Sequence, residues 1–411
     1  MKQESQIQIL EELLRLIDLG RDADAGVVLQ NPISAYTSDE IAAEEWRTLF
    51  LGHPQLIGLS GDLPEPGSFY RVDQFGIPVL ATRDASGKFH AFLNACRHRG
   101  ARLTSECHGK KHRFVCPFHG WSYSNQGELL AQSEALNFGA LEKEKLGLLE
   151  LPCEERFGML WVHPQTDGEL DVAKLLGSLA EEIDDWHLGD RIVCGNNTLS
   201  KPMNWKLAND TFGENYHFKR LHRDTLNHLA IGDAHVFEPF ERNSRLVFAS
   251  KGIEKIINRP KNDWRIDNAT TVLYYLFPNI QMTVSERQVT LFRIYADGPT
   301  ANGSTTEVTH YFSHDAMEII NTGQKTVIDE RTVYDPHARD GNAILSPAAA
   351  MEVINSTLEN EDFRMAEMAQ KSAESGMLEY LIFGRNEPAL HHFHNAIRGS
   401  LGMAQLDEYP N

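Results

Sequence analysis

The pattern of hydrophobic and polar positions changes along the chain. Residues 4–19 carry leucine and isoleucine at helical spacing, which predicts an amphipathic helix. A second short helix is expected over 38–50, where Ser38 can cap the first turn. From about 52 to 164 the pattern becomes short β-type runs separated by turn signals, which predicts a small all-β domain. Its expected strands are 69–72, 78–82, 89–93 and 159–162.

After residue 165 the pattern predicts helices at both ends of the segment and a group of strands between them. Helices are expected at 171–185 and 203–230, and two more at 347–375 and 387–400. Between these pairs, runs separated by hairpin-type turns predict a β-meander over 244–249, 271–277, 280–285, 288–295 and 305–312. Strands grouped together, with a long helix last, indicate an α+β class.

The expected organisation has three parts, which suits a chain of 411 residues at the usual domain size. N-terminal helices (1–44) pack on a larger α+β domain (166–411), and the all-β domain (45–165) is set between them in the sequence.

Charge and cysteine content indicate which partners and which cellular compartment the chain suits. The chain has 58 acidic and 39 basic side chains, a formal charge of −19, which argues against nucleic acid or an anionic membrane as its main partner. No stretch approaches the roughly 18 apolar residues of a membrane helix, and the N-terminus lacks the regions of an export signal. The cysteines are odd in number and sparse, which suits a reducing compartment. We therefore expect a cytoplasmic protein.

Two short segments combine cysteine with histidine. Cys96-x-His98 and Cys116-x-x-His119 each lie on a predicted loop between strands. These spacings are typical of a Rieske [2Fe–2S] centre, in which two thiolates bind one iron and two imidazoles bind the other. A structural zinc site is the alternative, but it usually has a cysteine pair followed by a histidine pair. The spacing therefore favours the cluster.

A second group of ligand-type residues follows in the larger domain. His217 and His222 lie about 140° apart on a regular helix, so both can face one metal only if the helix is broken between them. Two histidines and one carboxylate on one face of Fe(II) are typical of non-haem oxygenases. Asp362 is a candidate third ligand because it lies on the apolar stripe of its helix, and Glu361 is almost as well placed. That stripe consists of Met351, Ile354, Leu358, Met365 and Ala369.

Together the motifs resemble the catalytic α subunits of Rieske non-haem iron (aromatic ring-hydroxylating) oxygenases, from about residue 35 to 400. Rieske proteins of respiratory complexes have an extra cysteine in each ligand loop, where this chain has Ala101 and Phe118, so the oxygenase branch fits better. The family shares an Asn-Trp-Lys motif, a carboxylate-x-x-His-x4-His segment and a late Glu-Asp pair. These match at Asn204-Trp205-Lys206, Glu214/His217/His222 and Glu361-Asp362.

The resemblance implies a role for each matched residue. It implies a small all-β Rieske domain, with its cluster on Cys96, His98, Cys116 and His119, and a helix-grip catalytic domain, with its iron on His217, His222 and Asp362. Glu214 is implied to join the Rieske domain of one subunit to the iron site of its neighbour. Where the family often has Glu-Asn, this chain has Asn209-Asp210, so Asp210 is a second candidate for that bridge.

The implied function is the terminal oxygenase component of a multicomponent system. It would use O₂ to hydroxylate, once or twice, a small aromatic or other organic substrate, as in the catabolism of aromatic hydrocarbons. The resemblance also implies a homotrimer, with one [2Fe–2S] cluster and one mononuclear Fe(II) per chain. Because no G-x-G-x-x-G fingerprint is present, electrons are expected from a separate ferredoxin or flavin reductase.

Two alternatives stay open at this point. Glu214 is found in several family members that oxidise quaternary ammonium compounds, so a monooxygenase or demethylase of methylated amines is one alternative. The other, from a different class, is a Rieske electron-transfer protein without oxygenase activity.

Three further features carry expectations. Segment 97–113 has six basic residues against one acid, which predicts a docking surface for an acidic redox partner, with Lys110 and Lys111 exposed to solvent. The run 274–277 and Met282 are candidates for the substrate cavity or for ordinary core. His391 and His394 are expected on the face of a C-terminal helix rather than at a metal.

Overall fold

The computed structural model describes residues 1–228, 230–321, 332–334 and 343–410. They form two compact units, each described here by itself. One comprises 1–45, 176–187 and 191–411, and the other comprises 46–175 and 188–190. The boundaries at 45 and 165 inferred from the sequence stay predictions. The smaller unit is mainly β and the larger combines a sheet with helices, so the predicted α+β class is confirmed.

Three small antiparallel sheets form the smaller unit, in the orders β10-β5-β4-β3-β6, β11-β12-β2 and β7-β8-β9. The four predicted strands are confirmed, because β3, β4, β5 and β12 begin and end within one residue of the expected bounds. The strands are β2 Gln55–Leu59, β3 Ser68–Val72, β4 Val79–Arg83, β5 Phe89–Leu93, β6 His108–Lys110, β7 Arg113–Val115, β8 Ser122–Ser124, β9 Leu129–Ala131, β10 Glu150–Leu151, β11 Cys153–Arg156 and β12 Met159–Val162.

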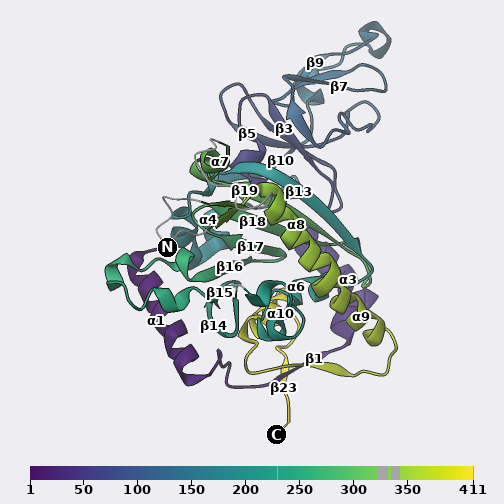
Figure 1. Cartoon of the computed structure of the whole chain (residues 1–411). Helices are drawn as coiled ribbons and strands as arrows, with labels where there is room; N and C mark the ends of the chain where they lie inside the picture. The colour runs from purple at the N-terminus through teal and green to yellow at the C-terminus, as the bar shows by residue number, and fades with distance from the viewer. Residues whose placement is uncertain (229, 322–331, 335–342, 411) are drawn as a thin grey trace. The chain divides into compact units, whose positions relative to one another are not determined.

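A seven-stranded antiparallel sheet is the centre of the larger unit, in the order β13-β19-β18-β17-β16-β15-β14 (Figure 1). The five inner strands match the predicted meander. They are β15 Asn243–Ser250, β16 Thr270–Leu276, β17 Ile280–Val284, β18 Gln288–Ala296 and β19 Ser304–Phe312. The edge strands β13 (Ile192–Lys201) and β14 (Ala230–Phe240) were not predicted, because edge strands are partly exposed and theirs have little apolar alternation.

The helices of the larger unit are mostly short. They are α1 Gln3–Leu19, α2 Ser34–Thr37, α3 Asp39–Glu45, α5 Ala180–Asp184, α6 Trp205–Asp210, α7 His314–Asn321, α8 Pro347–Thr357, α9 Phe363–Ala373 and α10 Pro388–Ser400. In Figure 1, α8 and α9 follow one another along the sheet, while α6 and α10 lie close together. Two small sheets, β22-β1-β23 (Tyr380–Phe383, Leu29–Pro32, Asp407–Glu408) and β20-β21 (Thr332–Tyr334, Ala343–Leu345), complete the larger unit. In the smaller unit, the expected helix at 171–185 begins as α4 (Val172–Leu176).

The expected helix over 203–230 is wrong. Helix α6 ends at Asp210, and only short 3₁₀ turns follow at Tyr216–Lys219 and Leu226–His228. At Gly213 a Cβ would come within 2.2 Å of Leu390 Cδ2 on α10, so any larger residue there would require the Leu390 side chain to shift. A regular helix is therefore interrupted in the segment that carries both candidate histidine ligands.

A π-helical turn, Leu358–Asp362, joins α8 to α9. Its extra residue rotates the following helix by about 100° relative to a continuous α-helix. As a result Met365, expected on the buried stripe, is 41% exposed, and Phe363, Ala366 and Gln370 are buried instead. The predicted apolar stripe is thus wrong at Met365, whereas Leu358 and Asp362 are buried and Met351, Ile354 and Ala369 are partly buried.

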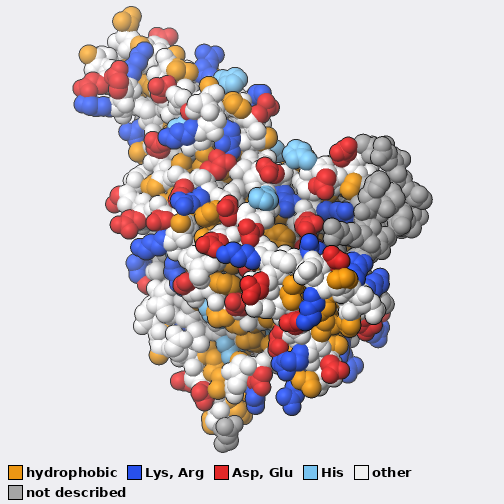
Figure 2. Space-filling model, turned by 90° about the vertical axis from the view of Figure 1, so that its left-hand side faces the viewer, with side chains coloured by type: hydrophobic (Ala, Val, Ile, Leu, Met, Phe, Trp, Pro, Cys, Tyr) orange, Lys and Arg blue, Asp and Glu red, His pale blue; other side chains and the backbone are white. Residues whose placement is uncertain are grey.

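Acidic and basic side chains are interspersed on the face shown in Figure 2, where no continuous basic surface gathers. Among the described residues, no helix is long and apolar enough to cross a membrane.

Candidate cluster and metal centres

The cysteine and histidine pairs occupy two loops with the same backbone hydrogen bonds. One loop follows β5 and the other lies between β7 and β8. In each, the cysteine N–H donates to the carbonyl five residues on, and a glycine four residues on, Gly100 or Gly120, donates back to the cysteine carbonyl. These glycines have φ of 71° and 72°, a conformation that is strained for other residues. The two loops are therefore a structurally matched pair.

The four ligand-type side chains pair across these loops, cysteine with cysteine and histidine with histidine. Cys96 and Cys116 are buried, and the pKa of the Cys96 thiol is raised by burial and by the neighbouring Cys116 thiol. The ring centroids of His98 and His119 lie 4.6 Å apart. His119 Nδ1 is buried and has no hydrogen-bond partner among the described residues. Two adjacent thiols and two adjacent imidazoles, one with an unpaired nitrogen, fit a Rieske-type [2Fe–2S] cluster.

Trp121 of the second loop and Tyr123 of strand β8 contact the first loop. The His98 ring stacks on Trp121 at 5.1 Å between centroids. Tyr123 is fully buried, and its hydroxyl lies 3.3 Å from Cys96 Sγ and accepts from Arg97 N–H at 3.0 Å. Sequence reasoning did not identify Tyr123, because a tyrosine on a short strand is not distinguishable from ordinary core.

In the larger unit, His217, His222 and Asp362 come together. The Nε2 atoms of the two histidines are 3.1 Å apart, and Asp362 Oδ1 lies 3.4 Å from His217 Nε2 and 3.1 Å from His222 Nε2. His217 lies on the 3₁₀ turn Tyr216–Lys219, His222 on the irregular turns after it, and Asp362 at the end of the π turn. Local breaks in helical geometry thus bring all three together.

This triangle has the dimensions of one face of a metal site. Ligands at right angles on a metal, each about 2.1 Å from it, lie about 3.0 Å apart. Burial disfavours the charged forms of all three groups, but their mutual hydrogen bonds outweigh burial: the pKa of His217 is raised to about 9 and that of Asp362 is lowered. Two imidazoles and one carboxylate on one side of a metal are a donor set that fits Fe(II) with open positions.

Each candidate histidine ligand has a second carboxylate behind it. Glu361 Oε2 lies 2.6 Å from His222 Nδ1 and accepts from the Thr225 hydroxyl at 2.9 Å. Glu214 contacts His217 Nδ1 and also accepts the His217 backbone N–H at 3.1 Å. The structure therefore separates the two carboxylates that periodicity left open: Asp362 faces the Nε2 atoms, and Glu361 faces the outer nitrogen of His222.

Asp210 lies in a different polar cluster. Its carboxylate accepts from the Tyr36 hydroxyl at 2.6 Å and lies 2.8 Å from His394 Nε2. Asn31 Nδ2 donates to the same Tyr36 hydroxyl at 2.9 Å. Burial and the neighbouring Asp210 raise the pKa of Tyr36 well above its usual value, so the phenol stays a donor. Asp210 is thus held by side chains of its own unit, and His394, expected on a helix face, contacts it from α10.

The Asn-Trp-Lys motif fixes the start of α6. Asn204 caps the helix, because its side chain accepts the Lys206 N–H at 3.0 Å. Lys206 Nζ donates to both oxygens of Glu45, at 2.6 and 2.7 Å, and Trp205 Nε1 donates to the same carboxylate at 2.9 Å. All of these side chains are buried. The motif therefore anchors, on α3, the helix that leads to Glu214 and His217.

A cavity of about 420 Å³ adjoins the His217–His222–Asp362 triangle. It lies between one face of the large sheet and α8, and the three candidate ligands line it together with Glu214. Its walls include four phenylalanines (Phe212, Phe218, Phe248 and Phe292), aliphatic side chains, and threonine, serine and glutamine side chains. Among the described lining residues there is no lysine or arginine.

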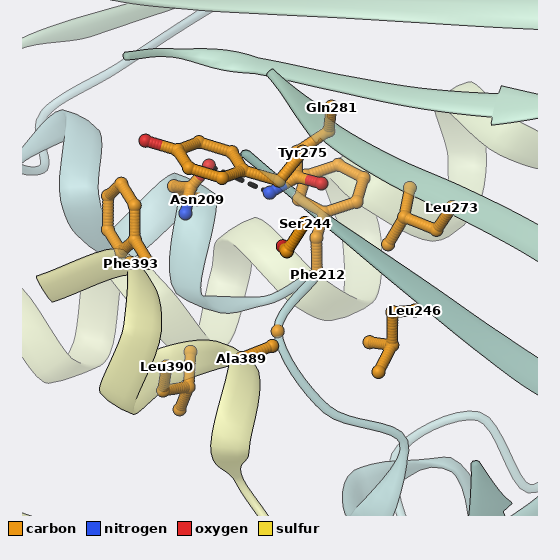
Figure 3. A pocket seen from close by; sticks show the side chains of 11 residues that line it. Asn209, Phe212, Ser244, Leu246, Leu273, Tyr275, Gln281, Ala389, Leu390 and Phe393 are labelled. Carbon is orange, nitrogen blue, oxygen red and sulfur yellow. Dashed lines mark hydrogen bonds between the residues drawn. The ribbon is translucent and has the colours of Figure 1, made fainter. Parts of the chain in front are cut away.

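Residues 274–277 and Met282, which the sequence left open between cavity and ordinary core, do not line the large cavity. Leu273 and Thr283 line the large cavity, whereas Tyr274 and Met282, on the opposite faces of the same strands, do not. The Tyr274 hydroxyl instead accepts from Trp186 Nε1 at 2.8 Å. Tyr275 lines a separate cavity of about 10 Å³, on the order of one water molecule. Figure 3 shows that cavity, beside the hydrogen bond in which Gln281 donates to Asn209 at 3.0 Å.

The basic segment 97–113 is partly neutralised. Lys110 pairs with Glu65 and Lys111 with Glu106, each at 2.6 Å, and Arg102 pairs with Asp73 at 2.9 Å. Lys110 is exposed, as expected, but Lys111 is only partly so and lies over the Phe69 ring. Arg97, Arg99 and Arg113 are also exposed, and Arg97 and Arg99 are next to the candidate cluster ligands in the sequence.

Comparison with known proteins gives matches to both units. The family described as "Ring hydroxylating alpha subunit (catalytic domain)" matches residues 183–402, and "Rieske [2Fe-2S] domain" matches residues 53–137.

Curated relatives include two kinds of oxygenase. The glycine betaine monooxygenase oxygenase subunit of Chromohalobacter salexigens is 29% identical over 219 residues, 51% of this chain and 48% of that protein. The biphenyl 2,3-dioxygenase subunit alpha of Rhodococcus jostii is 29% identical over 202 residues, 47% of this chain and 42% of that protein. These alignments span about half the length of the relatives or less.

A solved structure matches over more of the chain. The quaternary ammonium Rieske monooxygenase CntA, in complex with L-carnitine, aligns with a TM-score of 0.71 and 17% identity, covering 92% of this chain and 96% of that one. At this identity the likeness concerns the fold alone.

Proposed function

The chain belongs to the family of ring-hydroxylating oxygenase α subunits, and we propose that it is the terminal oxygenase of a multicomponent Rieske non-haem iron system. One observation carries the proposal: a single chain combines two Cys/His loops that fit a [2Fe–2S] cluster with a two-histidine, one-carboxylate triangle on the wall of a cavity of about 420 Å³. When bound, the cluster supplies single electrons and the iron activates O₂ for insertion into an organic substrate.

In this proposal the chain's own residues hold, orient and shield the metal. His217, His222 and Asp362 bind iron from one side, and their placement on the cavity wall leaves the other side for O₂ and substrate. Glu214 and Glu361 fix the imidazoles, because each accepts the Nδ1 proton and so leaves Nε2 as the metal-binding atom. The phenylalanines of the cavity exclude water from the reacting groups.

We also propose the assembly that the family resemblance implies. Three copies form a ring, and Glu214 links the iron site of one subunit to the Rieske domain of the next. The contact with a candidate iron ligand favours Glu214 over Asp210 as the link. Glu214 contacts His217 Nδ1 directly, whereas the Asp210 carboxylate contacts Tyr36 and His394.

Electrons are proposed to come from a separate ferredoxin or flavin reductase. The exposed side chains of Arg97 and Arg99 suit an acidic partner at the cluster. Sparse cysteines, all unpaired, support a location in the cytoplasm.

For the substrate, the cavity favours a small, mainly apolar organic molecule such as an aromatic compound. Its walls are mostly hydrophobic and its volume lies in the usual range of small-molecule pockets. A quaternary ammonium compound is the second candidate, because phenylalanine rings on a cavity wall can attract such a cation. The relatives named for glycine betaine and for quaternary ammonium oxidation support the same candidate.

The experiment is iron analysis joined to product analysis. We expect three irons per loaded chain and O₂-dependent product when a surrogate reductase and a substrate panel are supplied, with label from ¹⁸O₂ in the product. An electron carrier without oxygenase activity predicts two irons per chain and no product.

His217→Ala provides the matched variant, and it is expected to lose one iron and all product but to keep the Rieske visible and EPR spectra. Loss of the Rieske spectrum in a folded His217→Ala protein would contradict the assignment of separate sites.

A further inference from the structure

Four of the neutral polar side chains that line the large cavity lie on the hairpin β17–β18, and the others are Thr211, Ser250, Thr270, Thr271 and Thr357. Thr283, Ser285, Gln288 and Thr290 line the cavity here, and Thr283 lies directly opposite Thr290 in the sheet. Along β18 the cavity-facing positions change from polar at 288 and 290 to Phe292, whose ring lies 4.9 Å from that of Phe212. The cavity therefore has a neutral polar region next to an aromatic one.

Behind Thr290 lies a buried histidine on the next strand. His310 on β19 is the register partner of Thr290, and its Nδ1 lies 3.2 Å from Thr290 Oγ1. The side chain is fully buried, and burial lowers the pKa of His310 to about 4. The imidazole is therefore neutral at neutral pH and carries a single N–H.

The position of that N–H follows from the surroundings. His310 Nε2 is buried and has no hydrogen-bond partner among the residues that the structure describes. A proton on Nε2 would be a buried, unpaired donor, and unpaired donors are rarer in proteins than unpaired acceptors. A proton on Nδ1 instead donates to Thr290 Oγ1, and the unpaired atom is then only an acceptor. The Nδ1–H form is therefore favoured.

This tautomer determines whether the Thr290 hydroxyl acts as a hydrogen-bond donor toward the cavity. Gln288 Nε2 also donates to Thr290 Oγ1, at 3.4 Å. With both neighbours donating to its oxygen, the hydroxyl keeps its own proton for a third group, and the residue lies on the cavity wall. Thr290 is thus held as a donor.

We propose that Thr290 donates a hydrogen bond to a neutral oxygen acceptor on the substrate, such as a ketone or ether oxygen, and that His310 and Gln288 are positioning residues that keep its hydroxyl in this role. The inference rests on the proposed function, because it assigns this cavity to the substrate. It selects an apolar molecule with one neutral acceptor over the bare hydrocarbon. A carboxylate is disfavoured, since no described lining residue is a lysine or arginine that could neutralise it.

The test measures binding without turnover, on the purified full-length holoenzyme by titration calorimetry. The probes share one bicyclic skeleton: tetralin has no acceptor, 1-tetralone has a ketone, and 1-naphthoate serves as the carboxylate. Wild type is expected to bind 1-tetralone about tenfold more tightly than tetralin, the equivalent of about 1.4 kcal/mol, and to bind 1-naphthoate more weakly than either.

The variants separate the effect of the Thr290 hydroxyl on binding from the effect of the side-chain volume. Thr290→Val keeps the side-chain volume and is expected to weaken 1-tetralone binding to the level of tetralin, while the affinity for tetralin changes less than twofold. Thr290→Ser restores a hydroxyl and should restore the preference. For the positioning residue, His310→Asn keeps a donor near the Nδ1 position and should retain the preference, whereas His310→Leu should lose it. Tetralin affinity reports in each case that the cavity is intact.

The outcomes distinguish this inference from the proposed function. If Thr290→Val keeps the ketone preference, or if wild type has none or binds neither neutral probe, the donor assignment is wrong. If the preference is present and follows Thr290 but no ¹⁸O-labelled product is formed from any substrate, the subsite stands and the proposed oxygenase function fails. Should the His310 variants not fold, the Thr290 pair alone decides.

Discussion

Lys206→Met tests whether the buried ion pair between Lys206 and Glu45 stabilises the larger unit. Lys206 and Glu45 have side chains only 2% exposed each, and Lys206 Nζ contacts both carboxylate oxygens at 2.6 and 2.7 Å. Methionine matches the length of the lysine stem but removes the charge. Glu45 would then remain buried with Trp205 Nε1, at 2.9 Å, as its donor at this site.

The expected magnitude follows from that uncompensated charge. Removing one partner of a buried pair costs about 3–5 kcal/mol, far more than the median exposed pair at about 0–1 kcal/mol. In a unit of this size, 3 kcal/mol corresponds to a decrease in Tm of about 6–12 °C. The double variant Lys206→Met/Glu45→Gln should recover most of the loss, because glutamine still accepts from Trp205 but carries no charge.

Differential scanning calorimetry of the full-length chain measures the change in Tm for the unfolding of the larger unit. Lys2→Met is the matched control, since Lys2 pairs with Glu181 at 2.9 Å but their side chains are 73% and 81% exposed. The control should lower Tm by no more than about 4 °C. A Lys206→Met variant as stable as this control, or a double variant less stable than Lys206→Met, would refute the reasoning.

Three further predictions concern the metal site and the cavity wall. Asp362→Ala should lose the mononuclear iron and keep the Rieske EPR signal. The control is Glu359→Ala on the same π turn, whose side chain is 52% exposed, and it should keep both. Equal iron content in the two variants would contradict the ligand assignment. Glu361→Ala should weaken iron binding about 10- to 100-fold, measured by chelator competition, because His222 Nδ1 loses its acceptor. Lastly, the pKa of His310 is about 4 in the folded chain and about 6.5 in the unfolded chain. On acidification His310 is therefore protonated in the unfolded chain at a higher pH than in the folded chain. Folding stability should therefore fall between pH 6.5 and 4, by about 3 kcal/mol at most, and urea titrations should show a smaller loss for His310→Asn.

The chemistry of the two centres was accessible from sequence because most of its residues are close together in the chain. Cys96 and His98 share one tight loop, and Cys116 and His119 share its structural counterpart. Spacing alone therefore indicated an Fe–S centre. Asp362 is different, since its partners His217 and His222 are remote in sequence, and periodicity did not separate it from Glu361. The family resemblance made that choice.

The cavity was not accessible from sequence, and the reason is burial on both faces of the sheet. Strand β16 is buried at every position from Val272 to Leu276, so it has no alternation that marks the cavity side. Tyr274 and Leu273 are equally apolar in pattern, yet only Leu273 lines the large cavity. The contact between Thr290 and His310 depends on the register of β18 with β19, which a single sequence does not reveal.

The departures from regular helix lie at the candidate ligands, and geometry explains why. On a regular helix His217 and His222 point about 140° apart, and consecutive residues such as Glu361 and Asp362 about 100° apart. The 3₁₀ turn at Tyr216–Lys219 and the irregular turns after it bring both histidines to one point. The π turn lets Glu361 reach His222 Nδ1 while Asp362 reaches Nε2 of the same ring. Patterns that assume regular helices therefore fail first at these residues, because the contact between the three side chains requires the irregularity.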